Sequence, residues 1–387
     1  MEPEIQPPAP DAQGDETGTT PDNEGDGPRF AHEEAPVLIS LQRIFIGSRG
    51  LRAGWSVVSF IVLFLLLMIP LQVLFVRAHL VSHTHNPTAS EGFFAELAAF
   101  LALLGAAYLV ALMERRRLWD YNLAGPRRTG NFFAGLGVGF VALSALVAAL
   151  AGGGWLHFGP VALSGVAILR YGVLWGAMFL LVGCVEEGLF RCYLQSTLTR
   201  GINFWWALGL VAAMCLDLVI RAKGNGVWGV YAIVLLGLGP CVWLYVKKQE
   251  KASFWYAAWV TSALFGFVHT GNNGENWIGI FSAAAIGFVF CVSIWATGSA
   301  WWAIGCHAGW DWAETYFYGT ADSGLVPQGH LLTTSPAGNA FWSGGADGPE
   351  GSILILGVLL LLLAALVIYG RSKRGAPGSA LAEQAAD

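Results

Sequence analysis

The sequence has little charge. Asp, Glu, Lys and Arg make up 12% of its 387 residues, whereas a soluble domain usually carries about 25%. Hydrophobic residues make up 55%, and several apolar runs approach the roughly 20 residues needed to cross a bilayer. So little polar sequence cannot cover the surface of a soluble α/β protein of this size. These proportions predict an all-α fold: a polytopic bundle of transmembrane helices in contact with a lipid bilayer.

The charge that is present is unevenly distributed. The formal net charge is −5, but residues 1–36 hold ten acidic residues and a single base, Arg29. This segment is rich in Pro and Gly and poor in large apolar side chains, so burial cannot offset its ordering entropy. We therefore predict a disordered acidic tail over residues 1–40. Without the tail the chain is slightly basic, and no nucleic-acid partner is suggested.

Several common signatures are missing as well. No secretory signal peptide precedes the first apolar run, which begins near Trp55. The six cysteines show neither CxxC spacing nor a disulfide framework, which favours core packing. The sequence carries no HExxH zinc motif and no repeat with a period of 20–50 residues.

Ten apolar segments are candidate transmembrane helices. They cover residues 54–76, 93–113, 131–151, 171–198, 204–220, 226–246, 254–270, 277–297, 299–318 and 352–369.

Basic residues in the short loops predict the orientation. If ten spans alternate, most of these residues fall on one side, which should be the cytoplasm. This set includes Arg52, Arg115, Arg116, Arg117, Arg127, Arg128, Arg200, Lys247, Lys248, Arg371 and Lys373. Arg221 and Lys223 are the main exceptions. We predict an integral protein of the cell (inner) membrane with both termini in the cytoplasm.

The fourth span contains a charged motif, Glu186-Glu187-Gly-Leu-Phe-Arg191. Insertion scales put one Asp or Arg at a helix centre at roughly 2.5–3.5 kcal/mol, so the cluster should face protein or water. Glu187 and Arg191 are four residues apart and can form an ion pair. Glu186 lies about 100° round the helix and would point to a separate site, where apolar surroundings suit a general base. A buried ion-pair network that only locks helices together is the structural alternative.

Two histidines lie in later apolar spans. His269 ends a Phe-x-x-x-His motif in the seventh span, and His307 begins a His-x-x-x-Asp motif in the ninth. His307 and Asp311 share a helix face, so Asp311 could orient the imidazole or help hold a polarised carbonyl oxygen. At 1.5 Å per residue, Glu186, His269 and His307 lie roughly 20, 23 and 12 Å from the cytoplasmic ends of their helices. We expect the three side chains to meet near mid-membrane.

These three motifs, in this order in successive membrane helices, resemble the CAAX prenyl endopeptidase type II and bacteriocin-processing family, CPBP or Abi. The stretch from Gly298 to His307 is similar to the family's approach to its last motif. The stretch from Leu118 to Leu123 is similar to the segment before its core. The resemblance covers roughly residues 115–318 and implies an intramembrane protease of the glutamate type.

The resemblance also implies a role for each motif residue. It gives a catalytic group of four: Glu186, His269, His307 and Asp311. The first two would activate a water for attack on a peptide carbonyl, and the last two would stabilise the oxyanion. Glu187 and Arg191 would support the site.

The sequence departs from the family pattern at two places. Asn is also common where Asp311 stands, and an Asp adds negative charge beside a developing oxyanion. Orienting His307 is therefore the alternative role for Asp311. About 77 residues separate Arg191 from His269, which is long for the family and predicts an inserted helical pair near 204–246.

The predicted organisation has six parts. They are the acidic tail (1–40), N-terminal transmembrane helices (41–114), a CPBP-like protease core with its inserted pair (115–318), an extracytoplasmic loop (319–351), a final transmembrane helix (352–370) and a cytoplasmic tail (371–387).

Three functional hypotheses stay open at this point. The first is an endopeptidase acting on a membrane-associated peptide or protein without a cofactor. A CAAX-type enzyme would cut next to a prenylated cysteine. The second is a zinc-dependent version, with the metal held by the two histidines and the carboxylates. The third is a non-catalytic membrane protein, such as an immunity factor, scaffold or transporter.

Overall fold

A computed structural model describes residues 44–47, 50–82, 88–222, 227–248, 252–272, 274–322 and 328–374. The acidic tail predicted for residues 1–40 lies outside them, as does most of the predicted tail 371–387. From Phe45 onward the chain forms one compact unit, to which the following description refers.

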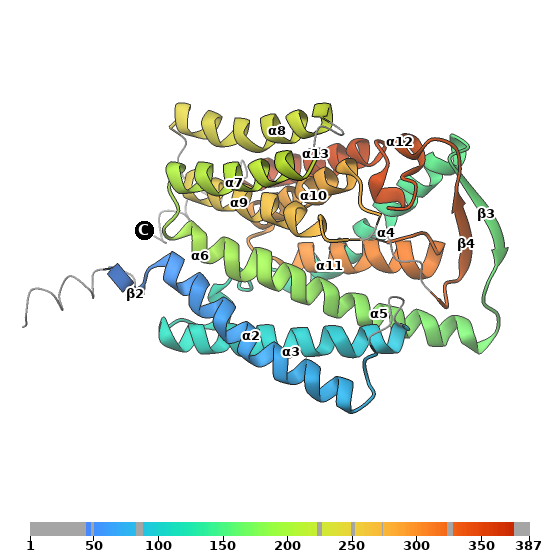
Figure 1. Cartoon of the computed structure of the whole chain (residues 1–387), viewed down its shortest axis with the longest axis horizontal. Coiled ribbons are helices and arrows are strands. Elements are labelled where there is room, and N and C mark those ends of the chain that lie inside the picture. Colours follow the sequence, from blue (N-terminus) through green and yellow to red (C-terminus); the bar gives the residue numbers. More distant parts are fainter. Residues whose placement is uncertain are drawn as a thin grey trace, which may run out of the picture. The chain divides into compact units, whose positions relative to one another are not determined.

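Ten helical passes run back and forth in the described part of this unit (Figure 1). They are α2 (Ala53–Arg77), α3 (Ala89–Met113), α4 (Arg128–Gly152), α5 (Val166–Glu187) continued by η2 (Gly188–Leu194) and α6 (Gln195–Thr199), α7 (Phe204–Ala222), α8 (Val227–Val246), α9 (Ala252–His269), α10 (Trp277–Thr297), α11 (Trp301–Asp311) continued by η3 (Trp312–Tyr318), and α13 (Ile355–Arg374). The predicted all-α bundle is confirmed, and each helix begins and ends within a few residues of its predicted span.

Seven of these passes are long and apolar enough to cross a membrane: α2, α3, α4, the α5–α6 pass, α7, α10 and α13. The other three predicted spans correspond to α8, α9 and α11, which are not among the seven. The regular part of α11 is only 11 residues long, because a π-helical stretch follows Asp311.

Short elements close the ends of the bundle. They are β1 (Ile46–Gly47), β2 (Gly50–Leu51), η1 (Leu118–Asp120), β3 (Leu156–Val161), β4 (Leu332–Pro336), α12 (Ala340–Ser343) and η4 (Pro349–Gly351). Strands β3 and β4 pair antiparallel. The prediction lacked these strands. They form where two long loops meet, because paired strands satisfy backbone polar groups that the helices leave unpaired.

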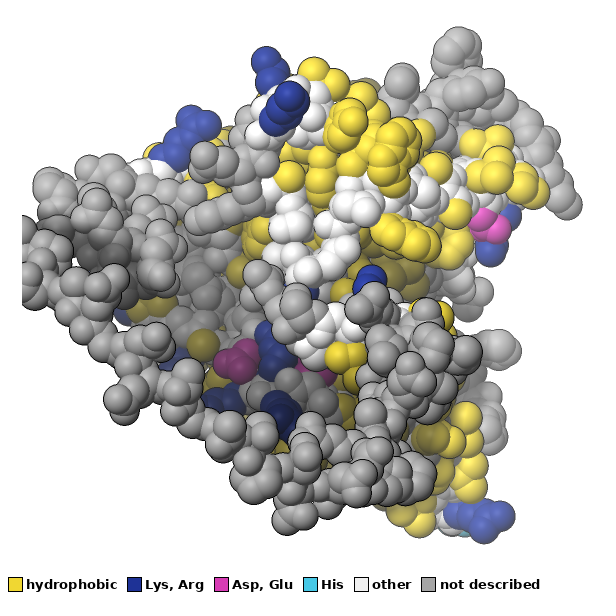
Figure 2. Space-filling view, turned by 90° about the vertical axis from the view of Figure 1, so that its left-hand side faces the viewer, with side chains coloured by type: hydrophobic (Ala, Val, Ile, Leu, Met, Phe, Trp, Pro, Cys, Tyr) yellow, Lys and Arg dark blue, Asp and Glu magenta, His cyan; other side chains and the backbone are white. Residues whose placement is uncertain are grey.

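Most described Lys and Arg residues lie at one end of the bundle, on the left in Figure 1. Figure 2 shows this end face-on, with basic side chains spread among hydrophobic ones. Helices α2, α4, α7, α9 and α11 begin at this end, and the passes between them finish there. The exceptions are Arg77, Arg170 and Arg221, together with Arg191, which is buried inside the bundle. Arg221 pairs with Asp217. The predicted asymmetry of charge is therefore present, while the side of the membrane that this end faces stays a prediction.

Helices α4 and α11 cross at glycines. A Cβ at Gly135 or Gly139 of α4 would collide with backbone carbonyls of α11, and one at Gly305 or Gly309 of α11 would collide with those of α4. Reciprocal pairs of small residues at this spacing let two membrane helices approach backbone to backbone. His307 lies midway between the two glycines of α11, so this crossing fixes its position.

Helices α7 and α8 pack beside α9. Their shared apolar cluster includes Val211 of α7, Cys241 of α8 and Tyr256 of α9. This is the segment predicted as an inserted pair. That reading stays a prediction, but the pair lies against one face of α9 rather than among the helices that carry the motif residues.

Candidate active site

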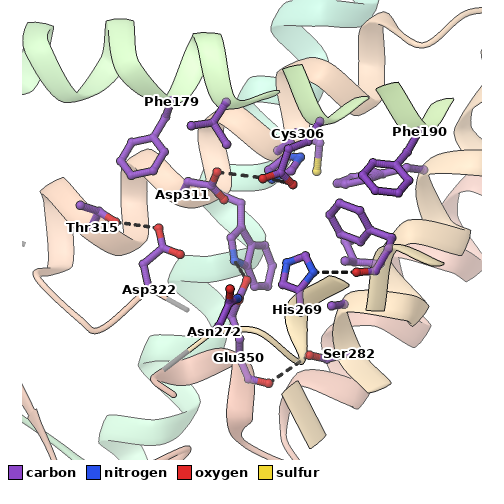
Figure 3. Close-up of a pocket in the computed structure, with 18 of the residues that line it drawn as sticks. Phe179, Phe190, His269, Asn272, Ser282, Cys306, Asp311, Thr315, Asp322 and Glu350 are labelled. Atoms are coloured by element: carbon purple, nitrogen blue, oxygen red, sulfur yellow. Dashed lines mark hydrogen bonds and ion pairs between the residues drawn. The ribbon is translucent and has the colours of Figure 1, made fainter. Parts of the chain in front are cut away.

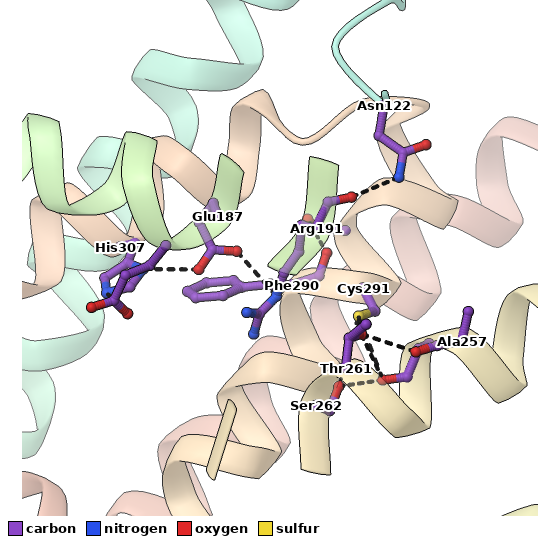
Figure 4. A network of polar contacts seen from close by, with 12 residues as sticks. Asn122, Glu187, Arg191, Ala257, Thr261, Ser262, Phe290, Cys291 and His307 are labelled. Carbon is purple, nitrogen blue, oxygen red and sulfur yellow. Dashed lines mark hydrogen bonds and ion pairs between the residues drawn. The ribbon is translucent and has the colours of Figure 1, made fainter. Parts of the chain in front are cut away.

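Glu187 lies at the centre of a buried charge network at the end of α5 (Figure 4). Its Oε2 is 3.1 Å from Nε of Arg191, and its Oε1 is 2.9 Å from Nδ1 of His307. Neither Glu187 nor Arg191 has exposed surface. The predicted ion pair is present, and it continues to His307, a contact that the sequence did not predict.

Aromatic rings surround the guanidinium of Arg191. Its Cζ is 4.3 Å from the ring centre of Phe265, 5.4 Å from that of Phe290 and 5.6 Å from that of Phe190. Arginine gains electrostatic attraction from aromatic faces, most strongly where water is excluded. Together with Glu187, these rings compensate a charge whose nitrogens have no hydrogen-bond partner among the described residues.

The helices that carry the motif acids change geometry directly after them. Residues Gly188–Leu194 follow Glu187 as a π-helix, and Trp312–Tyr318 follow Asp311 as another. π-Helical turns are rare and occur frequently at functional sites. The first one carries Arg191, so its wider turn positions the ion pair behind Glu187.

The ring of His307 is held at one nitrogen and open at the other. Nδ1 contacts Glu187, while Nε2 is 3.8 Å from Oε2 of Glu186 and 3.4 Å from Oδ2 of Asp311. The ring also stacks on Phe290, with centroids 5.7 Å apart. An Nδ1–H donated to Glu187 fixes the ring and turns Nε2 toward the two acids. The orienting contact thus comes from Glu187, and Asp311 lies beside the other nitrogen.

His269 lies at the end of α9 and is oriented by its own helix. Its Nδ1 is 2.7 Å from the backbone oxygen of Phe265, and the two rings are 4.7 Å apart. If Nδ1–H donates to this carbonyl, Nε2 carries the free lone pair. That tautomer can accept a proton from water.

All four residues of the predicted catalytic group line one cavity of about 620 Å³. Figure 3 shows this cavity, with His269 and Asp311 labelled on its wall. They come from α5, α9 and α11, and the cavity is otherwise walled largely by apolar side chains. The side chain of Glu186 is 35% exposed and that of Glu187 is 0% exposed, so the two neighbours face different surroundings. Glu186 faces the cavity, and the Glu187–Arg191 pair lies behind its wall. No described residue of α7 or α8 lines the cavity.

Residues 242–313 match the family of Rce1-like type II CAAX prenyl endopeptidases. The resemblance inferred from the motifs is confirmed over this segment. The Rce1-like segment contains His269, His307 and Asp311, and it begins near the end of α8. Comparisons with curated proteins and with solved structures found no match.

The cavity also contains an acid that the prediction missed. Glu96 of α3 lines it, on a helix that precedes the Rce1-like segment. Its signal was readable, because a carboxylate within an apolar span is costly and marks a functional position. The same argument identified Glu186.

Acidic groups elsewhere on the cavity wall had no such signal. Asp322 and Glu350 also line it, from loops that carry no membrane-span pattern. Among the described residues, three potential metal-ligand atoms lie within 4.8 Å of one another at Glu314, Asp322 and Glu350, and not at the two histidines.

Proposed function

We propose that the protein is an intramembrane endopeptidase that hydrolyses a peptide bond of a membrane-associated substrate. The observation that carries this proposal is the meeting of Glu186, His269, His307 and Asp311 at one cavity, from three helices. The Rce1-like match supports a protease at the level of the family. A buried ion-pair network that only held helices together would need the Glu187–Arg191 pair but would not need a cavity beside it.

The proposed reaction begins with a water between Glu186 and His269. The carboxylate of Glu186 lies in a mostly apolar cavity, where it accepts the water's proton as general base. The Nε2 lone pair of His269 accepts a hydrogen bond from the second hydrogen of that water and orients it. The resulting hydroxide attacks the carbonyl carbon of the scissile peptide bond and forms a tetrahedral intermediate. Glu186 then passes the proton to the amide nitrogen as the C–N bond breaks, which releases an amine and a carboxylic acid.

His307 is proposed to stabilise the oxyanion. In its protonated form, Nε2–H donates to the carbonyl oxygen as negative charge develops there, while Glu187 holds the opposite side of the ring. Asp311, 3.4 Å from Nε2, balances the charge of the imidazolium. We assign Asp311 no direct contact with the oxyanion, because two negative groups would repel.

The test is cleavage by Glu186→Gln in the full-length protein, reconstituted in lipid. Two substrates test whether cleavage requires a prenyl group: a prenylated CAAX peptide, and the same peptide with an unprenylated transmembrane anchor. General-base loss costs about 10²- to 10⁴-fold, so cleavage of the natural class should fall by that factor while the midpoint of thermal unfolding stays unchanged.

Glu91→Gln is the matched control, since Glu91 is an acid in the first turn of α3 and does not line the cavity. Its rate should equal that of the wild type. Full activity of Glu186→Gln would refute Glu186 as the general base. Absence of cleavage of both substrates by the wild type would favour a non-catalytic membrane protein with the same fold.

A further inference from the structure

A second group of three acids lies at the cavity, and two of them, Asp322 and Glu350, line its wall. Glu314 belongs to η3, Asp322 to the loop that follows, and Glu350 to η4. One carboxylate oxygen from each lies within 4.8 Å of the other two. The proposed peptide hydrolysis uses none of them.

Donors behind these carboxylates aim them at one point. The indole Nε1 of Trp310 donates to Glu314 at 3.0 Å and to Glu350 at 2.9 Å. The hydroxyl of Thr315 donates to Asp322 at 2.8 Å, as Figure 3 shows. Each acid is therefore anchored through one oxygen, which leaves its other oxygen for a ligand.

Glu314 supplies an independent sign of a missing ligand. It has no exposed surface, and its Oε1 has no hydrogen-bond partner among the described residues. Within that part of the chain, no Lys or Arg forms an ion pair with any of the three acids. A buried polar atom without a partner calls for an explanation such as an ion or water, and buried charges pair or coordinate metals.

The electrostatics of the group point the same way. Burial raises the pKa of Glu350 well above its ordinary value, and the charge of Asp322 raises it further. Burial also raises the pKa of Asp322. Three mutually repelling carboxyls need either protons or a cation between them.

We propose that Glu314, Asp322 and Glu350 together bind one hard divalent cation, with Ca²⁺ as the best-fitting ion. Carboxylate oxygens without nitrogen or sulfur suit Ca²⁺, Mg²⁺ and Mn²⁺ rather than zinc. Two ligands on opposite sides of Ca²⁺ are separated by about twice the 2.3–2.6 Å bond length, so oxygens within 4.8 Å can share it. Mg²⁺ demands near-ideal octahedral geometry at 2.0–2.1 Å, whereas Ca²⁺ accepts flexible coordination.

The bound cation would connect three segments: η3, the loop that contains Asp322, and η4. Glu350 precedes α13, and Glu314 follows the helix that carries His307 and Asp311. A shared ion therefore fastens the turn before α13 to the π-helical end of that helix. This inference does not depend on the proposed protease activity.

Calcium binding to the purified full-length protein tests the site directly. Equilibrium dialysis should find one calcium per chain, and calcium should raise the midpoint of thermal unfolding relative to chelator because it binds only the folded state. Asp322→Asn and Glu350→Gln should each weaken binding by at least about 10- to 100-fold, which is the typical loss when only an outer-shell partner of a metal ligand is removed. Glu275→Gln, a nearby acid outside the group, should bind like the wild type.

Terbium gives a second readout, since it replaces calcium and emits when a nearby indole is excited. Trp310 contacts two of the ligands, so bound terbium should emit strongly, calcium should displace it, and Trp310→Phe should lose most of the emission. Calcium and terbium binding can be measured on the wild-type protein, so this part of the test does not depend on whether a variant folds. If calcium, magnesium and manganese all leave the thermal midpoint unchanged and none binds, protons hold the three acids together and the proposal is wrong. Unchanged calcium affinity in both ligand variants would overturn it as well.

Discussion

Within the described part of the chain, Glu114 and Glu187 have fully buried side chains and pair with arginine, but they differ in what lies next to them. Glu114 follows α3 at the basic end of the bundle. Its carboxylate has four partners: Ser56 at 2.5 Å, Arg200 at 2.7 Å, Tyr121 at 3.4 Å and Arg116 at 3.5 Å. These groups join α2, α3 and the residue after α6, and Glu114 lines no described cavity.

Glu187 has two partners and a cavity beyond them. One oxygen meets Arg191, the other meets His307, and the far nitrogen of His307 faces Glu186 and Asp311 across the open space. A buried carboxylate surrounded by donors holds helices in place. A buried carboxylate that orients a histidine on a cavity wall can also contribute to catalysis. Burial and an ion pair alone do not separate these two uses.

The largest expected difference is in cleavage. Glu187→Gln cannot hold His307 through a charge and leaves Arg191 without its anion, so the rate should fall about 10²-fold or more. An amide in place of the acid behind a catalytic histidine costs about 10⁴-fold in serine proteases. Glu114→Gln should stay within a few-fold when rates are expressed per folded molecule. Equal losses of cleavage rate in the two variants would contradict the distinction between a structural role for Glu114 and a catalytic role for the Glu187 network.

The second prediction tests whether the glycine crossing of α4 and α11 positions His307 of the Glu187 network. Gly139→Ala places a methyl group against the backbone of α11, which should cost about 1–3 kcal/mol and lower cleavage by moving His307. Gly137→Ala on the same helix is the matched control, because nothing lies within 4 Å of its added Cβ. Thermal unfolding and cleavage of both variants check this. Equal behaviour of the two would show that the crossing does not position the histidine.

The Glu114 network should affect stability without affecting chemistry. Arg200→Ala leaves a buried carboxylate short of its closest cationic partner, so unfolding should become easier by about 1–3 kcal/mol. Cleavage per folded molecule should not change. Arg371→Ala, an exposed basic residue at the same end, should alter neither property. A large drop in cleavage by folded Arg200→Ala would place Glu114 within the catalytic machinery.

The smallest effect concerns pH and compares two acids outside the spans. Burial and the charge of Asp347 raise the pKa of Glu275 from 4.5 to about 8. For Glu114, burial acts to raise the pKa, but hydrogen bonds from Arg200 and Ser56 outweigh it, and the pKa is lowered.

The signs of the two contributions are opposite. Between about pH 4.5 and 8 the folded protein binds more protons at Glu275 than the unfolded chain does, so this stabilisation declines as the pH rises. The contribution of Glu114 is present above about pH 4.5 and is lost on acidification. Thermal midpoints measured from about pH 5 to 8 should fall in the wild type and fall less in Glu275→Gln. An identical slope in both proteins would rule out Glu275 as the cause.

Hydropathy predicted the helices well because the bilayer requires long uninterrupted apolar runs. Helix α2 was expected at 54–76 and spans Ala53–Arg77, and α10 has its predicted bounds. Strands β3 and β4 were missed because they pair residues 171 to 180 positions apart, outside any span. The π-helical stretches were missed because their apolar composition equals that of an α-helix.

The candidate site was predictable only where its members share a helix. The spacing of Glu187 and Arg191 gave their ion pair, whereas the contact between Glu187 and His307 joins residues 120 positions apart. No local pattern carries that information. Glu96 carries the same local signal as Glu186, a carboxylate within an apolar span, so its place at the cavity was predictable from the sequence.

The crossing of α4 and α11 has a consequence for the surrounding lipid. Backbone meets backbone at Gly139 and Gly309, so no side chain between these helices can be squeezed or rotated to let them slide. A thicker or thinner bilayer must then be accommodated elsewhere, first at α2, where only 6% of the span is buried against protein. His307 should therefore keep its position relative to α4 when the thickness of the surrounding bilayer changes.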